Sequence, residues 1–406
     1  MARANNAWWV VFAATIGLIV GNGPILQFAY GVFLRPLTEE FRVDRATLST
    51  AILVGFIATG LSTLVVGRLV DRYGIRAVVL PSIVLFALSI AALSLSPASP
   101  AFFIALYGVA GVFAGGQTPL PYAKAVAGSF DRRRGLALGI AMTGVGIGTI
   151  LIPQLAQYLI SLLGWRGAYV GLGMAVFLIA FPPVYLFLRD PVAAVQKANG
   201  EVAGLTAIQA TRTPQFWSLA FIFFALVCVP AGVIAHIVPI LTDQGISPQI
   251  ATSAISAAGV ALIVGRLIAG YMLDRIWAPY VTLFFIFIPM MGLGLLFLPI
   301  TPTVAVAATI CVGLGLGAEV DLIAFMIARY FGFRSFGEIY GYLFAVFTFG
   351  SGLGPFLMGL SFSKTGAYST AIVVMTVGLM IAACLVLLLG PYRYANLLKH
   401  EIETEA

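Results

Sequence analysis

Charged residues are scarce in this chain of 406 residues: Asp, Glu, Lys and Arg together make up only 9% of it. A soluble globular domain carries about a quarter of its residues as charges, so the composition argues against a soluble protein. Histidine and cysteine are also rare, with two and three residues, which excludes a histidine metal cluster and a disulfide framework. The cysteines Cys228, Cys311 and Cys384 fall within apolar runs, as small buried hydrophobic residues do.

Apolar residues, by contrast, make up 61% of the chain and form runs of about 20 residues along its whole length. A run of that length crosses a bilayer as a helix, whereas a soluble fold of this size could not bury so much apolar surface. The sequence therefore predicts an all-α membrane protein with twelve transmembrane helices. We expect the helices at residues 8–34, 47–70, 77–95, 101–127, 134–162, 168–188, 216–241, 249–273, 279–299, 303–330, 337–360 and 367–389.

The 22 Lys and Arg residues are distributed unevenly between alternate loops. With the N-terminus in the cytoplasm, the cytoplasmic segments hold about three times as many of them as the outer loops. This bias predicts that both termini are cytoplasmic and that the chain lies in the inner (plasma) membrane. Because the basic residues stand singly or in short clusters between apolar runs, the net charge of +7 indicates topology rather than binding to nucleic acid.

A short pattern recurs after about half of the chain. The recurring residues are Gly67, Asp71 and Arg72, which reappear as Gly270, Asp274 and Arg275. A second pair, RGLALG at 134–139 and FGEIYG at 336–341, has nearly the same spacing. With an even number of helices in each half, the halves are predicted to be parallel repeats, related by a pseudo-twofold axis along the membrane normal. Such repeats place a substrate site between them near the bilayer midplane.

The repeat predicts four segments along the chain. We expect a six-helix bundle at 1–188, a cytoplasmic linker at 189–213, a second six-helix bundle at 214–392 and a cytoplasmic tail at 393–406. The linker is the longest polar stretch, which is why we place the boundary between the two halves there.

The segment GRLVDRYGIR at 67–76 resembles the loop signature of the major facilitator superfamily, and its partial repetition at 270–275 strengthens the likeness. The resemblance covers the whole chain and implies a secondary transporter that works by alternating access. The residues that would form a closable cytoplasmic seam of paired charges are Asp71, Arg72, Arg76, Asp274 and Arg275. Such a seam has to break before the substrate site opens to the cytoplasm.

Three further stretches, at 129–141, 212–217 and 265–270, resemble the bacterial monocarboxylate porter and oxalate–formate antiporter branch. In that branch the eighth helix carries an arginine that binds the substrate carboxylate, and Arg266 matches it. Leu262 stands where animal monocarboxylate porters carry an aspartate, and Phe347 stands about where oxalate–formate antiporters carry a lysine. The missing lysine disfavours a divalent, oxalate-like substrate, and the missing aspartate leaves proton coupling without its usual residue.

The position of Arg266 supports the same role on physical grounds. It lies about seven residues before the predicted cytoplasmic end of its helix, too deep for the side chain to reach water easily. A charge at that depth is costly unless it is paired or faces a water-filled cavity. The planar guanidinium matches a carboxylate with two hydrogen bonds, so we expect a carboxylate anchor. The alternative is a structural ion pair with an acid on the tenth helix.

That helix holds Glu319 and Asp321, the only acids inside the apolar runs. Two residues apart, they point in directions about 200° apart around the helix, so we expect only one to face the cavity. One of them would meet Arg266 or carry a proton, and a substrate anion that captures Arg266 would promote protonation of its former partner. The alternative is that both acids only hold helices together.

Other polar residues in the apolar runs are candidates for the cavity wall. Gln117 lies opposite Glu319 by the repeat, and the further candidates for substrate contact are Tyr122, Asn22, Gln27 and Tyr30. Lys124 lies near the cytoplasmic end of its helix, where we expect it to reach the interface. His236 is a candidate for proton coupling, since histidine titrates near neutral pH, or else a helix-packing residue.

The sequence shows no P-loop, no Cys/His metal spacing and no nucleophile constellation. We therefore expect no enzymatic activity, no cofactor and no metal. The prediction is a monomeric proton-coupled symporter of a small organic carboxylate, with the proton, the carboxylate and the lipid bilayer as its partners. The alternatives are a carboxylate exchanger, a facilitator or exporter of a neutral or cationic compound, and a membrane sensor or enzyme that transports nothing.

Overall fold

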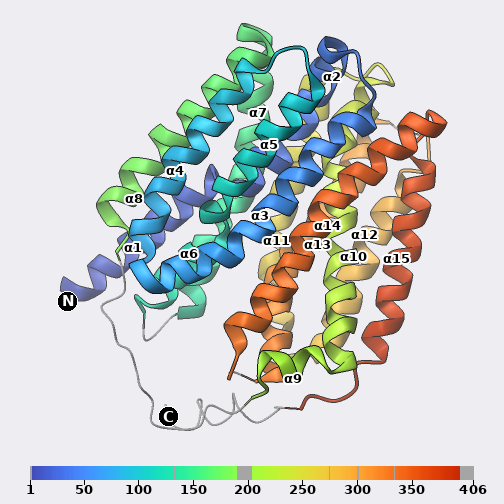
Figure 1. The fold of residues 1–406 in the computed structure, drawn as a ribbon. Coiled ribbons are helices and arrows are strands. Elements are labelled where there is room, and N and C mark those ends of the chain that lie inside the picture. The colour runs from blue at the N-terminus through green and yellow to red at the C-terminus, as the bar shows by residue number, and fades with distance from the viewer. Residues whose placement is uncertain are drawn as a thin grey trace.

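The computed structural model describes residues 2–130, 134–189, 204–273, 275–299, 301–332 and 334–393. Within these ranges the protein is all-helical, and its one β-bridge joins Gly204 to Gly332. Helix α1 begins and helix α15 ends on the same side of the molecule (Figure 1), which we call the terminal side. The opposite side is called the far side.

The N-terminal half comprises α1 (Ala2–Ile19), α2 (Tyr30–Phe41), α3 (Arg45–Tyr73), α4 (Ile75–Ala92), α5 (Pro100–Ala114), α6 (Pro119–Ala127), α7 (Arg134–Ala175) and α8 (Phe181–Phe187). The C-terminal half comprises α9 (Ala207–Thr211), α10 (Pro214–Thr242), α11 (Pro248–Leu273), α12 (Ala278–Leu295), α13 (Pro302–Phe331), α14 (Phe336–Thr365) and α15 (Ser369–Leu387). Short π or 3-10 segments lie at Gly23–Phe28, Leu93–Leu95, Gly115–Gln117 and Val176–Ala180.

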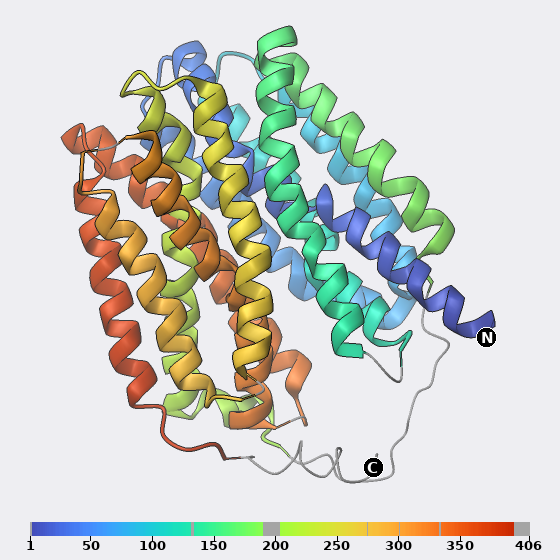
Figure 2. The same cartoon turned by 180° about the vertical axis from the view of Figure 1, so that it is seen from behind.

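Eleven helical spans in the described residues are long and apolar enough to cross a membrane. One of them, Leu136–Phe187, has 52 residues, which at about 1.5 Å per residue is more than twice the thickness of a bilayer core. It contains the two helices predicted at 134–162 and 168–188. At Gly164 the backbone leaves the helical region, with φ 67° and ψ 176°. Figure 2 shows the chain reversing its direction on the far side within this span.

Several helices begin at polar caps that the sequence supplies. Asp44 accepts a hydrogen bond from the backbone of Thr47 at 3.0 Å and starts α3, and Thr213, followed by a proline, starts α10 in the same way. Within the predicted linker, the described part contains α9, which has a capping box between Thr206 and Gln209. The segment before α9 is held by a hydrogen bond from Leu205 N to Phe331 O, 2.8 Å long.

The buried apolar side chains form two cores. One is built almost entirely from the N-terminal half and the other from the C-terminal half. Phe28 and Val32 of the N-terminal half are members of the second core, and Ala235 of the C-terminal half is a member of the first. Each half therefore packs mainly on itself, with a limited number of side chains crossing between the halves.

Two helix pairs carry most of the contact between the halves: α3 with α14, and α7 with α11. The backbones of α3 and α14 approach closely at Gly352: a Cβ atom there would lie only 3.0 Å from Leu53 Cα. Between α7 and α11, Gln154 donates to Ser256 at 3.2 Å. On the terminal side the ribbons of the two halves diverge (Figure 1), and a cavity of about 530 Å³ lies there between α3, α6 and α14.

Candidate functional site

A smaller cavity of about 90 Å³ lies at the centre of the molecule, between the halves. Most of its wall is apolar, with a few convergent polar groups, as in sites for small molecules. The polar side chains of the wall are Asn22, Gln27, Gln117, Arg266, Glu319, Thr348 and Ser351. Arg266 is the only basic residue among the described residues of this wall.

Two breaks in the helices shape the N-terminal side of the cavity. The helix predicted at 8–34 is interrupted by the π segment Gly23–Phe28, and the helix predicted at 101–127 by the 3-10 segment Gly115–Gln117. Pro24 and Pro119 stand at these breaks and lack the N–H that a continuous helix needs. Irregular backbone at membrane depth is tolerated where it lines a cavity or is buried in protein. The prediction of two uninterrupted helices was therefore wrong at the site itself.

Arg266 connects three helices at the cavity. Its side chain, only 10% exposed, forms an ion pair in which Nε lies 3.1 Å from Asp321 Oδ2 on α13. One of its terminal nitrogens donates to the carbonyl of Met142 on α7 at 3.0 Å, across the boundary between the halves. The contact with Asp321 lacks the alignment of a hydrogen bond, since Nε has no hydrogen-bond partner. A pairing with an acid on the tenth predicted helix is thus present, and its arginine lies in the cavity wall while its acid lies beside the wall.

Glu319 lies on the cavity wall with Arg266 and is buried, with 1% of its surface exposed. Neither of its carboxylate oxygens has a hydrogen-bond partner. Asp321, two residues further along α13, pairs with Arg266 but is not part of the wall. The two acids therefore differ in the way that their separation on the helix predicts: one faces the cavity, and the other reaches the arginine from the side.

Close packing of α11 against α13 brings these charges together. A Cβ atom on Gly317 would lie 2.3 Å from Leu262 O and 2.7 Å from Arg266 N. Only glycine leaves room for the two backbones to approach this closely. The small residue therefore sets the distance between the helix that carries the arginine and the helix that carries the acids.

The remaining candidates divide between the wall and the layer behind it. Asn22, Gln27 and Gln117 line the cavity, and Asn22 Oδ1 and Gln27 Nε2 have no hydrogen-bond partner. Tyr122 donates to Gln117 Oε1 at 2.8 Å and is not part of the wall, so its contact orients the amide. Tyr30 also lies behind the wall, where its ring packs edge to face on Tyr107.

The larger cavity on the terminal side contains further charged groups. Arg68, Lys124 and Glu338 line it, so Lys124 borders this space rather than the central cavity. Phe344 on α14 lines both cavities. We call the larger cavity the vestibule.

The residues predicted to form a charge seam are only partly described. Asp274 and the side chain of Asp71 lie outside the described residues. Arg72 lies over the ring of Tyr73, Arg76 over Tyr185 and Arg275 over Tyr271, in each case within its own half. The seam remains a prediction.

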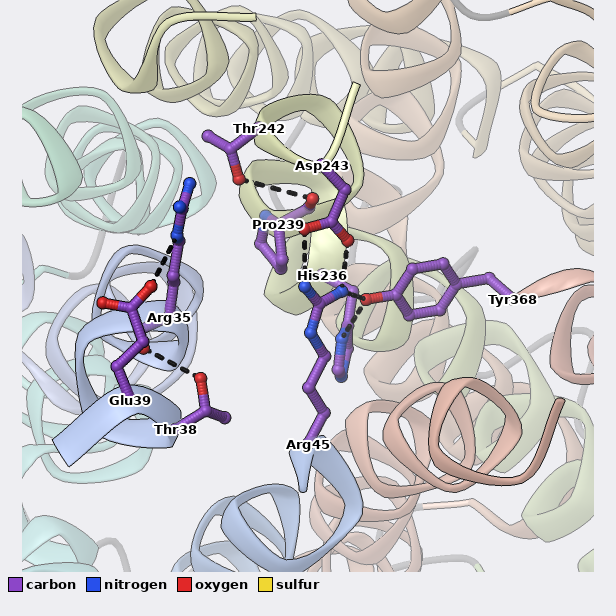
Figure 3. A network of polar contacts seen from close by, with 9 residues as sticks. All are labelled: Arg35, Thr38, Glu39, Arg45, His236, Pro239, Thr242, Asp243 and Tyr368. Atoms are coloured by element: carbon purple, nitrogen blue, oxygen red, sulfur yellow. Dashed lines mark hydrogen bonds and ion pairs between the residues drawn. The ribbon is translucent and has the colours of Figure 1, made fainter. Parts of the chain in front are cut away.

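His236 lies on the far side, apart from the central cavity. It is fully buried, and its Nε2 is 2.9 Å from the carbonyl oxygen of Pro355. Beside it, Arg45 of α3 forms an ion pair with Asp243 at 2.7 Å (Figure 3). This pair was not predicted from the sequence. The sequence did contain a signal for it. Arg45 and Asp243 carry opposite charges at the far-side ends of the second and seventh predicted helices, and their separation of 198 residues is close to the spacing of the internal repeat.

An all-helical chain with many membrane-length helices and a small polar cavity between two halves has the architecture of a membrane transporter. The chain belongs to the Major Facilitator Superfamily, whose family model matches residues 16–355. It is therefore a multi-pass membrane protein of a transporter family and not an enzyme. The superfamily prediction is confirmed.

Relatives of known sequence and structure agree with this assignment. Monocarboxylate transporter 11 of Mus musculus is 28% identical over 394 residues, which covers 91% of this chain and 85% of the relative. YhjX, an MFS-type transporter of Escherichia coli (strain K12), is 25% identical and covers 84% of this chain and 85% of its own length. A bacterial homolog of the human lysosomal transporter Spinster, in an inward-facing and unoccupied conformation, has the same fold, with a TM-score of 0.72, 19% identity and coverage of 95% and 96%.

Proposed function

We propose that this protein is a secondary transporter that carries a small, monovalent organic carboxylate together with one proton. The observation that carries the proposal is Arg266, the one cation among the described residues of the central wall, buried between the halves and next to two acids. Its planar guanidinium has five N–H donors and binds carboxylates with two parallel hydrogen bonds. Similarity to monocarboxylate transporters supports this choice of substrate class.

The charges of the site suggest how a proton moves with the substrate. Arg266 and Asp321 balance each other, and a carboxyl group as buried and unpartnered as that of Glu319 is tolerated best in its neutral form. When a substrate carboxylate binds Arg266, it replaces Asp321 as the partner of the guanidinium. Asp321 then regains neutrality by taking up a proton. One carboxylate and one proton therefore enter together, and the net charge of the site does not change.

The size of the central cavity favours a small substrate. One water molecule takes up about 10–15 Å³ of such a cavity. A cavity of about 90 Å³ therefore has room for roughly six to nine water-sized groups. That is enough for a carboxylate of a few heavy atoms, whereas sites for drug-sized molecules measure about 300–1,000 Å³. A facilitator of bulky drugs is therefore a poorer fit to this wall.

We propose that the two halves, 1–188 and 214–392, rock about this cavity as two six-helix bundles related by a pseudo-twofold axis. The long span Leu136–Phe187 then counts as two crossings, which makes twelve in all. The charge bias places the terminal side in the cytoplasm, with both termini. Contacts between the halves on the far side and the vestibule on the terminal side then describe a state directed toward the cytoplasm.

Uptake into proteoliposomes tests the proposal. A panel of labelled small carboxylates is offered with and without an inward proton gradient, to wild type and to four site variants: Arg266→Gln, Arg266→Lys, Glu319→Gln and Asp321→Asn. We expect Arg266→Gln to abolish uptake and Arg266→Lys to restore little, because lysine keeps the charge but loses the planar fork. Glu319→Gln mimics the neutral acid and should retain gradient-driven uptake. Arg35→Gln, at an exposed pair within α2, is the matched control and should behave as wild type.

Three results would count against this function. Uptake that survives in Arg266→Gln would remove the carboxylate anchor. Gradient-driven uptake that persists in Asp321→Asn would remove the proposed proton site. Uptake that needs carboxylate on both sides and ignores the gradient would indicate an exchanger.

A further inference from the structure

Four side chains on the far side form a connected network, which we call the far-side latch: Arg45, His236, Asp243 and Tyr368 (Figure 3). Arg45 begins α3 in the N-terminal half. Asp243 follows α10, and Tyr368 precedes α15, so both belong to the C-terminal half. Every contact that Arg45 makes in the network therefore joins one half to the other.

The contacts of Arg45 are those of a strong, partly desolvated ion pair. Its two terminal nitrogens each lie 2.7 Å from a different oxygen of Asp243, which is the bidentate geometry of the best arginine–carboxylate pairs. The guanidinium also donates to the hydroxyl of Tyr368 and lies 3.9 Å from the centre of the Phe362 ring. Its side chain is only 12% exposed. The far side cannot open until these contacts break.

The hydrogen bonds of His236 determine which of its nitrogens carries a proton. Nε2 is 2.9 Å from the carbonyl oxygen of Pro355, which only accepts, so Nε2 carries the hydrogen. Nδ1 is 3.4 Å from the hydroxyl of Tyr368. That hydroxyl already accepts from Arg45, so its own hydrogen is available for Nδ1. With the Tyr368 hydrogen directed at Nδ1, the chain of donors from Arg45 through Tyr368 to His236 fits a neutral imidazole.

A second proton on His236 would disrupt this arrangement. Nδ1 would become a donor and face the O–H of Tyr368, and a second cation would lie fully buried beside Arg45. The charged groups near His236 are Arg45 and Asp243, and Asp243 is already engaged by both nitrogens of Arg45. Ser49 of α3 is the remaining polar neighbour, at 3.4 Å. Arg35 and Glu39 of α2 pair with each other at 2.9 Å and are well exposed.

We propose that the far-side latch is a proton-sensitive gate: it closes only while His236 is neutral, and acid on the outer side favours the open form. The assignment of the outer side, and the benefit to the cell, rest on the function proposed above. An acidic exterior would then open the carrier outward under the conditions in which proton-driven uptake is possible. The gate responds to protons, whereas the central acids carry them.

Proton linkage gives the size of the effect. In the closed latch the hydrogen bonds of His236 fit the neutral ring, while a histidine exposed to water in the open form takes up a proton near pH 6.5. Lowering the pH therefore favours the form that binds the extra proton. The ratio of open to closed molecules should rise about tenfold between pH 7.5 and pH 5.5.

Distance measurements between spin labels on the far side test the proposal without any substrate. Labels attached through Ser161→Cys on α7 and Lys364→Cys on α14 report the separation of the halves, since both positions are exposed and lie near the far-side ends of their helices. The natural cysteines are replaced by alanine in this background. Asp243→Asn serves as a sensitised background, because a weakened latch populates the open form enough to be counted.

We expect acid to lengthen the label distance in the His236 protein and to change the open fraction less than twofold in His236→Gln. Glutamine keeps a neutral donor for the Pro355 carbonyl, and His236→Asn is the second variant if glutamine fails to fold. Glu39→Gln is the control that should keep the full response. A response that persists in His236→Gln, or a sensitised protein without any response, would overturn the gate. If carboxylates are not taken up but the label distance still responds to pH, the proposed substrate is wrong and the proposed gate stands.

Discussion

Replacing Asp321 with asparagine tests the central claim that substrate and acid compete for one arginine. In the wild type, a carboxylate that binds Arg266 has to displace an ion pair with a 3.1 Å contact. Asparagine keeps the shape of the side chain and removes its charge. The guanidinium then keeps the carbonyl of Met142 as a partner and has no ion pair with Asp321 to break. We therefore expect the variant to bind carboxylate more tightly.

The magnitude follows from the geometry of the pair. Two unit charges 3.1 Å apart attract each other by about 5 kcal/mol at an effective dielectric constant near 20. Asp321 is 37% exposed, so solvent screens the pair and its net contribution to the free energy is smaller. A net gain of about 1–2 kcal/mol corresponds to binding that is roughly five- to thirtyfold tighter.

Equilibrium binding of the transported carboxylate to purified protein measures this change in affinity. Proteoliposome uptake measures whether transport remains coupled to protons. Because the asparagine side chain cannot take up a proton, uptake by Asp321→Asn should lose its stimulation by an inward proton gradient. Glu39→Gln removes an exposed acid elsewhere and should change neither quantity. Unchanged or weaker binding in Asp321→Asn would refute the competition between substrate and acid.

Three further variants test other parts of the structure. Gly317→Ala puts a Cβ atom 2.3 Å from a carbonyl oxygen of α11. It should lower the free energy of unfolding by about 1–3 kcal/mol and abolish most uptake. Gly294→Ala, whose Cβ atom would have nothing within 4 Å, is the control and should change neither quantity. Exchanging the latch charges, Arg45→Asp with Asp243→Arg, should recover uptake that each single variant loses; a double variant no better than the singles would show that the pair is not the contact that matters. Phe344 lines both the central cavity and the vestibule, so Phe344→Ala should enlarge the central cavity, and competition assays should then show weaker discrimination against larger carboxylates.

Much of the fold was predictable because its signals are local. Apolar runs predicted eleven membrane-length spans, and the twelfth predicted segment is the second part of the span that reverses direction near Gly164. Arg266 was identifiable because a lone cation deep in an apolar run is costly in a membrane unless it is paired or faces a cavity, whatever the position of its helix. The breaks at Pro24 and Pro119 were missed, since proline inside a membrane helix often produces only a kink.

The sequence by itself determined that this protein crosses a membrane many times, belongs to a transporter superfamily and buries one arginine among its helices. Only the tertiary structure decided that Glu319 faces the cavity while Asp321 pairs with Arg266, and that Arg45, Asp243 and His236 meet on the far side. The physical reason is that helices apolar on every side carry no pattern that sets their rotation. Close contacts at residues such as Gly317 set that rotation, and they exist only once the helices have packed.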